Sequence, residues 1–269
     1  MGFTVIIPAR FASSRLPGKP LMDINGQPMV QWTWQSAMDA GADQVIIATE
    51  SHAVKQACEA FGASVCLTSP SHQSGTERIA QVIEDWPLAP ETIIVNVQGD
   101  EPMLPARLIH QVAQGLQDHA HVAMATLCEP IDSVDTVFDP HSVKVVRNQA
   151  GLAMTFSRAP LPWSRDTFSE APTLPDQGGY LRHIGLYAYR AGFVTQYVAW
   201  PVCALEQVEC LEQLRVLWHN EPILVLDAET DAGIGVDTPD DLQKVREALF
   251  HPSIRPHSTP ALGPADANG

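Results

Sequence analysis

A short apolar strand that runs directly into a basic loop, residues 5–21, constrains this chain more than any other stretch. The strand begins with three β-branched residues, Val5 to Ile7, and Pro8 ends it because proline has no backbone N–H for the next ladder bond. The loop carries three cations, Arg10, Arg15 and Lys19. Small or hydroxylic residues, among them Ala9 and Ser14, accompany them. Such a loop can wrap a polyphosphate, with N–H groups and cations facing the oxygens. A solvated basic turn is the alternative.

The composition makes this cation cluster unusual. The 269-residue chain has a formal net charge of −15 and only 16 Lys and Arg, three of which fall within ten residues. The acidic balance argues against general nucleic-acid binding, which requires a basic face. A small anionic ligand remains compatible if its site is locally positive.

Strands and helices alternate along the first half of the chain. After the first strand, apolar runs predict strands at residues 45–49, 65–67 and 92–97, and helical spacing predicts helices at 29–40, 52–61 and 76–86. This order indicates an α/β fold with a mostly parallel, doubly wound sheet and right-handed crossovers. Ligands of such sheets bind at the carboxyl ends of the strands.

The second half continues the pattern less regularly. Strands are predicted at residues 121–127, 142–147, 153–156, 186–189 and 223–226, and helices at 106–118, 206–218 and 240–250. Residues 160–179 are rich in Pro, Ser, Asp and Gly and predict a loop. We expect one α/β domain over residues 1–250 and a disordered tail over 251–269, which has four prolines and no apolar periodicity.

A second polar site follows the strand predicted at residues 92–97. The turn Gln98-Gly99-Asp100-Glu101-Pro102 places two carboxylates at the sheet edge, where Asp100 can offer a hard oxygen ligand to Mg²⁺. Glu101 is the weaker candidate because adjacent turn residues seldom face one ion. A turn that only caps a helix is the alternative.

A third polar segment opens the helix predicted at residues 76–86. Its hydroxyls and N–H groups at a helix N-terminus can hold ribose or phosphate oxygens, and the residues concerned are Gln73, Ser74, Gly75, Thr76 and Arg78. Ordinary capping by Ser74 or Thr76 is the alternative.

The motif Pro-Ala-Arg-x-x-Ser-x-Arg-Leu-Pro-Gly-Lys-Pro-Leu at residues 8–21 resembles the signature of the sugar-acid cytidylyltransferases, above all those specific for 3-deoxy-manno-octulosonate. Similar motifs recur to about residue 248. The resemblance implies a nucleotide-diphospho-sugar transferase-like fold, with nucleotide binding mainly in residues 1–105 and sugar-acid binding mainly in 120–235. It also implies that Asp237 is the second metal-binding aspartate beside Asp100. Without the resemblance, Asp237 reads equally well as a helix-capping residue.

Three second-half patterns match the sugar-binding segments of that family, at residues 156–163, 181–187 and 211–215. A sugar acid needs a cation for its carboxylate and hydrogen-bonding groups for its hydroxyls. The implied sugar-acid-binding residues are Arg158, Arg165, His183, Tyr187, Glu212 and Gln213. Without the resemblance, these residues would be interpreted as exposed polar side chains, and Arg215 could simply pair with Glu212 on one helix.

The resemblance implies a Mg²⁺-dependent transfer of CMP from CTP to 3-deoxy-manno-octulosonate, for lipopolysaccharide biosynthesis, by a homodimer. The triphosphate would be held by Arg10, Arg15 and Lys19, and the metal by Asp100 and Asp237. The nucleotide would also be contacted by Pro8, Ala9, Ser14, Gln98 and the segment from Gln73 to Arg78. A cytidylyltransferase for sialic acid or another keto-sugar acid is the nearest rival, and a non-catalytic nucleotide-sugar binding module is a remote one.

Several other functions lack their motifs. The sequence has neither G-x-G-x-x-G after the first strand nor G-x-x-x-x-G-K-[ST], which argues against dinucleotide binding and a P-loop. The five cysteines form no C-x-x-C pair and predict free thiols in a reducing compartment. No apolar run is long enough to span a membrane and no signal peptide precedes the first strand, so we expect a cytoplasmic protein without membrane or nucleic-acid partners.

Overall fold

A single large sheet organises the computed structural model, which describes residues 2–12, 16–169, 171–175 and 178–250. Within those residues nine strands form the sheet, and seven of them run side by side in the order β11-β7-β10-β6-β1-β4-β5. The seven strands are β1 (Phe3–Pro8), β4 (Gln44–Thr49), β5 (Ser64–Leu67), β6 (Ile93–Asn96), β7 (Met124–Pro130), β10 (Leu181–Arg190) and β11 (Ile223–Asp227). The predicted α/β fold with a mostly parallel sheet is confirmed.

Strand β10 is the antiparallel member. It pairs antiparallel with β6 on one side and β7 on the other, whereas the remaining neighbours of the seven are parallel. It is also longer than the strand predicted at residues 186–189, because the alternation continues through a bulge between Ile184 and Tyr187. Strands β8 (Lys144–Arg147) and β9 (Ala153–Ser157) pair with each other, and β8 joins the sheet through β10.

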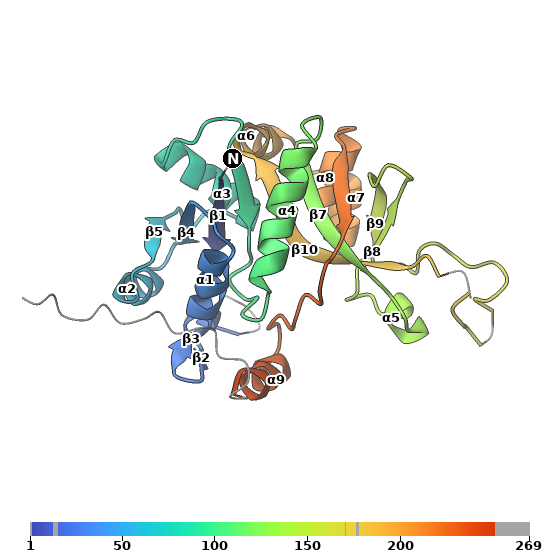
Figure 1. The fold of residues 1–269 in the computed structure, drawn as a ribbon, viewed down its shortest axis with the longest axis horizontal. Coiled ribbons are helices and arrows are strands. Elements are labelled where there is room, and N and C mark those ends of the chain that lie inside the picture. Colours follow the sequence, from blue (N-terminus) through green and yellow to red (C-terminus); the bar gives the residue numbers. More distant parts are fainter. Residues whose placement is uncertain (1, 13–15, 170, 176–177, 251–269) are drawn as a thin grey trace, which may run out of the picture.

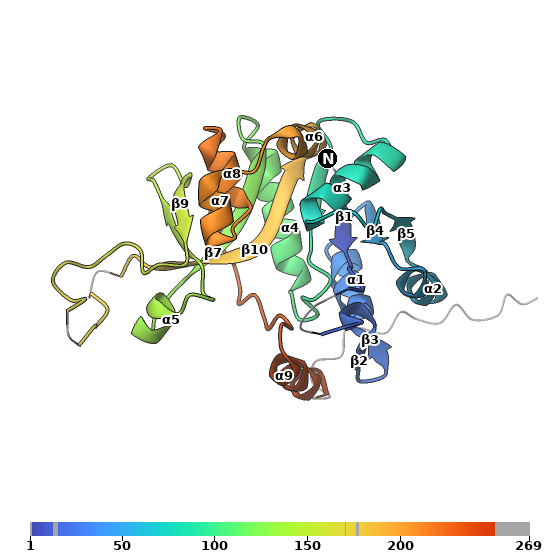
Figure 2. The ribbon, with the colours of Figure 1, turned by 180° about the vertical axis from the view of Figure 1, so that it is seen from behind.

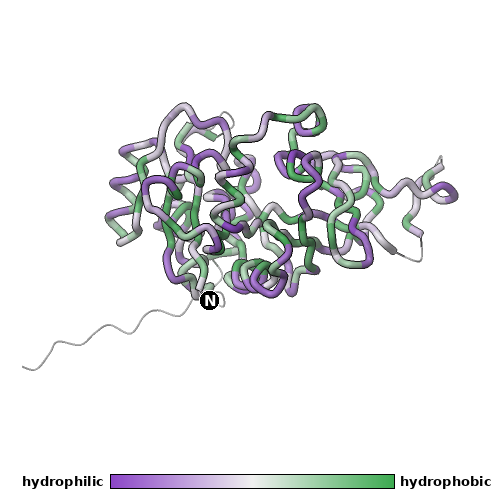
Figure 3. The backbone as a smooth tube through the Cα atoms, turned by 90° about the horizontal axis from the view of Figure 1, so that it is seen from above, coloured by the Kyte–Doolittle hydropathy of each residue, from purple (hydrophilic) through white to green (hydrophobic). Residues whose placement is uncertain are grey.

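Helices cover both faces of the sheet (Figures 1 and 2). Helices α1 (Met29–Asp39), α2 (His52–Ala60) and α4 (Ala106–Asp118) share one core with the sheet, and α3 (Gly75–Asp85), α6 (Ala191–Ala199) and α8 (Gln213–Trp218) share the other. Successive residues of β1 serve the two cores in turn: Val5 and Ile7 face the first and Ile6 faces the second. The outer helices alternate between hydrophilic and hydrophobic stretches (Figure 3), as amphipathic helices on a sheet require.

The helix predicted at residues 206–218 is wrong in one respect. The structure has two short helices there, α7 (Ala204–Glu209) and α8 (Gln213–Trp218). Cys210 adopts a left-handed conformation, with φ of 52°, and ends α7. The apolar spacing runs through the break, so periodicity could not reveal it, and the break leaves Glu212 at the start of α8 instead of in mid-helix.

A small subassembly brings the end of the chain back to the basic loop. A two-stranded hairpin, β2 (Asp23–Ile24) and β3 (Gln27–Pro28), follows the short 3-10 helix η1 (Lys19–Leu21). Helix α9 (Pro239–Phe250) packs against it through an apolar cluster of Leu16, Ile24, Met29, Val236, Leu242 and Val245. This packing holds Asp237, just before α9, beside the N-terminal loop.

Residues 131–142, together with 158–169 and 171–175, extend from the body of the molecule, whereas β8 and β9 pack on its core (Figure 1). A cluster of Ile131, Val137, Phe168 and Tyr180 joins this extension, which includes α5 (Val134–Phe138), an element that the sequence pattern did not predict. The predicted loop over residues 160–179 contains no helix or strand where the structure describes it. Ser14, Arg15 and the tail 251–269 lie outside the described residues. Among those that are described, no helix is both long and apolar enough to cross a bilayer.

Candidate active site

A cavity of about 490 Å³ lies at the carboxyl ends of β1 and β6, and we call it the Lys19 cavity. Its lining comes from five separate stretches of chain: Pro8, Ala9, Arg10, Ala12, Lys19, Pro20, Gln73, Ser74, Gly75, Gln98, Gly99, Asp100, Glu212 and Asp237. Most of the residues that the sequence assigned to the nucleotide therefore border one space.

Lys19 occupies the centre of this arrangement. Its ammonium Nζ lies 2.5 Å from Asp100 Oδ2 and 3.3 Å from Asp237 Oδ1, although the two aspartates are 137 residues apart in the sequence. The Lys19 side chain is largely buried, whereas Asp237 is mostly exposed. Two carboxylates from distant segments therefore converge on one small volume that a cation can fill.

Backbone contacts fix the two aspartates relative to each other. The N–H of Val236 donates to the carbonyl of Asp100 at 2.9 Å, which ties the segment before α9 to the turn after β6. Gly99 lets that turn approach β1 closely, because a Cβ at this position would lie 2.9 Å from the carbonyl oxygen of Pro8. Asp100 consequently lies at the edge of the sheet, next to the start of the basic loop.

The opposite wall of the Lys19 cavity is the N-terminus of α3. Ser74 caps this helix, accepting a hydrogen bond from the N–H of Glu77 at 3.1 Å. Arg10 is exposed and donates from Nη1 to the carbonyl of Gln73 at 3.1 Å. A guanidinium and the positive end of a helix dipole thus face the cavity from the same side, which favours an anion there.

Arg78 does not line the Lys19 cavity, in contrast to the predicted nucleotide contact. Its side chain is 1% exposed, and burial lowers the pKa of its guanidinium. It donates to Thr68 Oγ1 at 2.5 Å and pairs with Glu50 at 3.1 Å. Glu50 in turn accepts the N–H of Phe11 at 2.9 Å. Arg78 therefore supports the basic loop through Glu50, a residue that the sequence pattern gave no reason to select.

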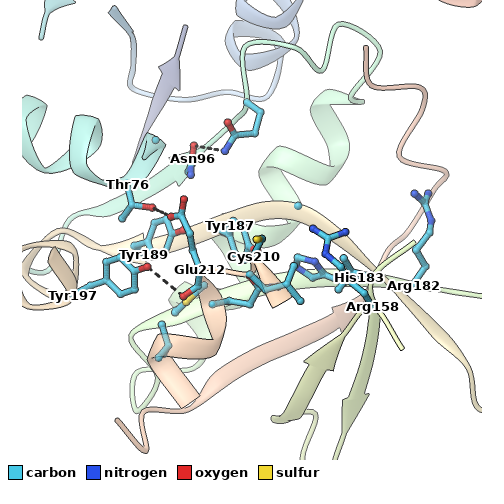
Figure 4. A pocket seen from close by; sticks show the side chains of 18 of the residues that line it. Thr76, Asn96, Arg158, Arg182, His183, Tyr187, Tyr189, Tyr197, Cys210 and Glu212 are labelled. Carbon is cyan, nitrogen blue, oxygen red and sulfur yellow. Dashed lines mark hydrogen bonds between the residues drawn. The ribbon is translucent and has the colours of Figure 1, made fainter. Parts of the chain in front are cut away.

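A second cavity of about 510 Å³ adjoins the first, and we call it the Tyr187 cavity. Figure 4 shows most of its lining, which includes Thr76, Asn96, Arg158, Arg182, His183, Tyr187, Tyr189, Tyr197, Glu212 and Gln213. Gly75, Gln98 and Glu212 border both cavities, so the two spaces meet at these residues.

Glu212 bridges the two halves of the chain at this junction. Thr76 donates from its hydroxyl to Glu212 Oε2 at 2.9 Å, and Tyr197 donates to the Glu212 carbonyl at 3.2 Å (Figure 4). Burial raises the pKa of the Glu212 carboxyl, with the Thr76 hydrogen bond opposing the change. Arg215 does not pair with Glu212: it makes two hydrogen bonds to Glu206, at 2.7 and 2.6 Å.

His183 is buried in the wall of the Tyr187 cavity as a neutral imidazole. Burial, and then the charge of Arg182, lower its pKa from 6.5 to about 3. Its Nε2 lies 3.0 Å from Thr126 Oγ1, and that hydroxyl also lies within 3.0 Å of two backbone carbonyls. Because the hydroxyl proton serves a carbonyl, Nε2 is the donor to Thr126 and Nδ1 stays an acceptor. His183 can therefore bind a hydroxyl but supplies no positive charge.

The positive charge in the Tyr187 cavity comes from two arginines. Arg158 donates from Nε to the carbonyl of Glu209 at 2.7 Å and from Nη1 to that of Pro140 at 2.9 Å. Arg182 pairs with Glu129 at 2.5 Å. Among the described residues, no carboxylate pairs with the guanidinium of Arg158. This guanidinium is therefore suited to bind the carboxylate of a ligand.

The remaining predicted residues divide between cavity and surface. Gln213 lines the Tyr187 cavity, and its buried Nε2 has no hydrogen-bond partner in the described part of the chain. Arg165 is exposed and borders neither large cavity. Glu101, the weaker metal candidate, lines a separate small cavity, and burial followed by the charges of Asp100 and Asp237 raises its pKa to about 7.

This fold and these joined cavities are those of a nucleotidyltransferase. The family model described as "Cytidylyltransferase" matches residues 4–223, and the chain belongs to the cytidylyltransferase family. It is 66% identical over 250 residues to the 3-deoxy-manno-octulosonate cytidylyltransferase 1 of Hydrogenovibrio crunogenus, covering 93% of this chain and 96% of the relative. It is 55% identical to the 3-deoxy-manno-octulosonate cytidylyltransferase of Aliivibrio fischeri, covering 93% and 99%.

Solved structures agree with the sequence relatives. A CMP:2-keto-3-deoxy-manno-octonic acid synthetase complexed with CTP superposes with a TM-score of 0.85 at 40% identity, covering 93% of this chain and 98% of that one. The 4-diphosphocytidyl-2C-methyl-D-erythritol synthase of Anaerococcus prevotii, at 12% identity and a TM-score of 0.60 over 92% and 98% of the two chains, shares the fold alone. The predicted resemblance to the cytidylyltransferases specific for 3-deoxy-manno-octulosonate is confirmed.

Proposed function

We propose that the chain transfers CMP from CTP to 3-deoxy-manno-octulosonate and releases pyrophosphate. A bond forms between the anomeric 2-hydroxyl oxygen and the α-phosphorus, and the bond from that phosphorus to the oxygen that bridges to the β-phosphate breaks. Pyrophosphate leaves with that oxygen, and the hydroxyl proton passes to solvent. The observation that carries the proposal is the contact between the two cavities at Gly75, Gln98 and Glu212. A triphosphate in one cavity and a sugar acid in the other would meet there.

The Lys19 cavity would hold the nucleotide. Arg10, Lys19 and the N-terminus of α3 neutralise phosphate oxygens, and stabilisation of the leaving pyrophosphate is their main contribution to rate. Gln73 to Gly75 and Gln98 would hold the cytidine end, and Thr76 would contribute through Glu212 at the junction of the two cavities. Ser14 and Arg15 keep the nucleotide-binding role that the resemblance implies. No covalent intermediate is required, because in-line displacement depends on positioning and charge.

Asp100 and Asp237 would hold Mg²⁺. Both carboxylates reach the same ammonium, at 2.5 and 3.3 Å, so the pair can face one ion. Mg²⁺ takes one or two protein carboxylates and completes its shell with water and phosphate oxygens, which fits a pair of aspartates beside a triphosphate. When bound, the ion would neutralise charge at the α-phosphate.

The Tyr187 cavity would hold the sugar acid. Arg158 supplies the cation for its carboxylate, because the other cation in the wall, Arg182, is already paired with Glu129. Neutral His183, Tyr187, Glu212 and Gln213 bind its hydroxyls. Arg165 keeps the predicted sugar-acid role only if the extension that carries it moves toward the cavity.

The wider biological setting is proposed on the same basis. A homodimer is supported by large apolar side chains that stay mostly exposed, among them Met154 on β9 and Trp163 on the extension. A cytoplasmic location is supported by the five cysteines, all of which are free. The activated sugar acid would serve lipopolysaccharide biosynthesis.

Pyrophosphate release tests the proposal. The purified protein, CTP and Mg²⁺ are incubated with 3-deoxy-manno-octulosonate or with sialic acid, and pyrophosphate is measured. We expect rapid release with the first acid and at least about 100-fold less with the second, because the hydrogen-bonding groups of the cavity match one set of hydroxyls. Equal rates with both acids, or release only with sialic acid, would contradict the substrate assignment.

A further inference from the structure

A tight turn, Asp139–Ser142, forms part of the rim of the Tyr187 cavity. His141 and Ser142 line that cavity, and the turn is closed by a hydrogen bond from the Ser142 N–H to the Asp139 carbonyl at 3.2 Å. The Asp139 carboxylate also accepts the N–H of His141 at 2.8 Å. The turn therefore places two residues on the cavity wall, and neither was expected there from the sequence.

Two cations bind the carbonyl oxygens of this turn. Lys144 donates from Nζ to the Asp139 carbonyl at 2.8 Å and to the Ser142 carbonyl at 2.5 Å. Arg158 donates to the carbonyl of Pro140, between them, at 2.9 Å. The turn is thus the shared anchor of a buried lysine and of the arginine proposed to bind the sugar acid.

Lys144 is unusual because it is fully buried yet forms no ion pair within the described residues. Lys144 is the first residue of β8. In the sheet it lies opposite Arg182 of β10 on one side and opposite Ser157 of β9 on the other. Burial lowers the pKa of its ammonium, opposed by Asp139, so the charged form is costly here. A methionine or leucine would fill the same space at lower cost if only packing mattered.

We propose that Lys144 is a positioning residue for the sugar acid, which rests on the proposed function. By holding the carbonyls of Asp139 and Ser142, it fixes the turn whose Pro140 carbonyl aims the guanidinium of Arg158. It also adds a positive charge, without a direct ion-pair partner among the described residues, behind the wall that receives a carboxylate. Lys144 itself lines neither large cavity, so it acts through the turn and Arg158.

The variant Lys144→Met tests this role, since it keeps the side-chain length and removes the charge and the donors. We expect the KM for the sugar acid to rise at least about tenfold, which corresponds to the loss of one charge-assisted hydrogen bond. The KM for CTP should stay within about twofold of its original value. The melting temperature should stay within a few degrees, because the buried charge is removed together with its desolvation cost. Lys55→Met, at a partly exposed lysine of α2, is the matched control and should change neither constant.

A second variant reaches the same turn without altering a buried group. Asp139 is exposed, and Asp139→Ala removes only the carboxylate that accepts the His141 N–H. We expect the KM for the sugar acid to rise about threefold with an unchanged KM for CTP. This measurement decides the question if Lys144→Met does not fold.

The outcomes separate this inference from the proposed function. Failure of the unaltered protein to release pyrophosphate with any sugar acid would overturn the proposed function. Normal turnover of the unaltered protein, with the sugar-acid KM unchanged in folded Lys144→Met and in Asp139→Ala, would overturn the role of Lys144. A proportional loss in both KM values would also overturn it, because a merely structural lysine would affect both cavities.

Discussion

The ammonium of Lys19 lies 2.5 Å from the carboxylate of Asp100, at the point where the basic loop meets the turn after β6. The same ammonium reaches Asp237 from the far end of the chain. One cation thus holds together the two carboxylates that we propose as metal ligands. If a triphosphate and Mg²⁺ bind as proposed, phosphate oxygens would compete for Lys19, and the two aspartates would be neutralised by the ion.

Removing either aspartate should abolish catalysis without unfolding the protein. In Asp100→Ala and in Asp237→Ala we expect pyrophosphate release to fall at least about 100-fold, because one metal ligand and its charge are lost. Circular dichroism should show an unchanged fold, since Asp237 is mostly exposed and the sheet does not depend on it. Asp39→Ala, at the exposed end of α1, serves as the control with full activity. Full turnover of either test variant would refute the metal assignment.

Lys19→Ala should weaken the binding of the triphosphate more than that of the monophosphate. Because Lys19 is proposed to stabilise the leaving pyrophosphate, which CMP lacks, we expect CTP affinity to fall by about 10- to 100-fold, as for the loss of a hydrogen bond to a charged group. CMP affinity should change by less than about threefold. Calorimetric titration of both nucleotides measures the difference, and equal losses would exclude a leaving-group role.

The neutral state of His183 predicts a pH dependence of stability. Because its pKa falls from 6.5 in the unfolded chain to about 3 in the folded protein, the unfolded state binds more protons between these values. The contribution of neutral His183 to the free energy of unfolding is therefore complete above pH 6.5. It is lost as the pH falls toward 3, at about 1.4 kcal/mol per pH unit. His183→Gln keeps a donor for Thr126 but does not titrate.

The comparison of the two proteins isolates this group from the many carboxylates that also titrate. Chemical denaturation at pH 7 and pH 5 should show a decrease in the free energy of unfolding that is about 2 kcal/mol larger in the unaltered protein than in His183→Gln. Equal decreases would mean that the folded protein protonates His183 at its ordinary pKa.

Glu50→Ala should disturb both stability and the basic loop. It leaves the fully buried Arg78 without its ion-pair partner, for which we expect a loss of about 3 kcal/mol in the free energy of unfolding. It also removes the acceptor for the N–H of Phe11, so CTP affinity should fall although Glu50 does not line the cavity. Glu59→Ala, an exposed control on α2, should change neither quantity, and unchanged CTP affinity in folded Glu50→Ala would disprove the supporting role.

Sequence patterns reveal the strand ends of this fold well, because each buried strand gives an apolar run followed by polar residues. That rule placed Arg10, Lys19, Gln98 and Asp100 at one sheet edge before any coordinates. The rule fails where function depends on tertiary contacts between residues that carry no pattern. Glu50 acts through a contact with Phe11, 39 residues away in the sequence, and Lys144 acts through backbone carbonyl groups. Neither kind of partner can be recognised from the sequence around a single charged residue.

Two further discrepancies have the same physical origin. Arg78 has the residue type and position of a phosphate ligand, but its guanidinium is turned inward because Glu50 and Thr68 offer it buried acceptors. The break between α7 and α8 depends on the left-handed backbone of Cys210, a conformation that cysteine does not favour on its own. Packing of Leu211 and the placement of Glu212 outweigh local preference there.

The fate of the phosphorus atoms tests the central claim most directly. CTP labelled at the α-phosphate is incubated with the protein, Mg²⁺ and 3-deoxy-manno-octulosonate, and the products are separated. The account predicts that the label moves quantitatively into a CMP-sugar acid while unlabelled pyrophosphate appears in equal amount, and that neither product forms with Asp100→Ala. Label found only in free CMP or CDP, or a labelled CMP-sugar acid made at full rate by Asp100→Ala, would contradict it.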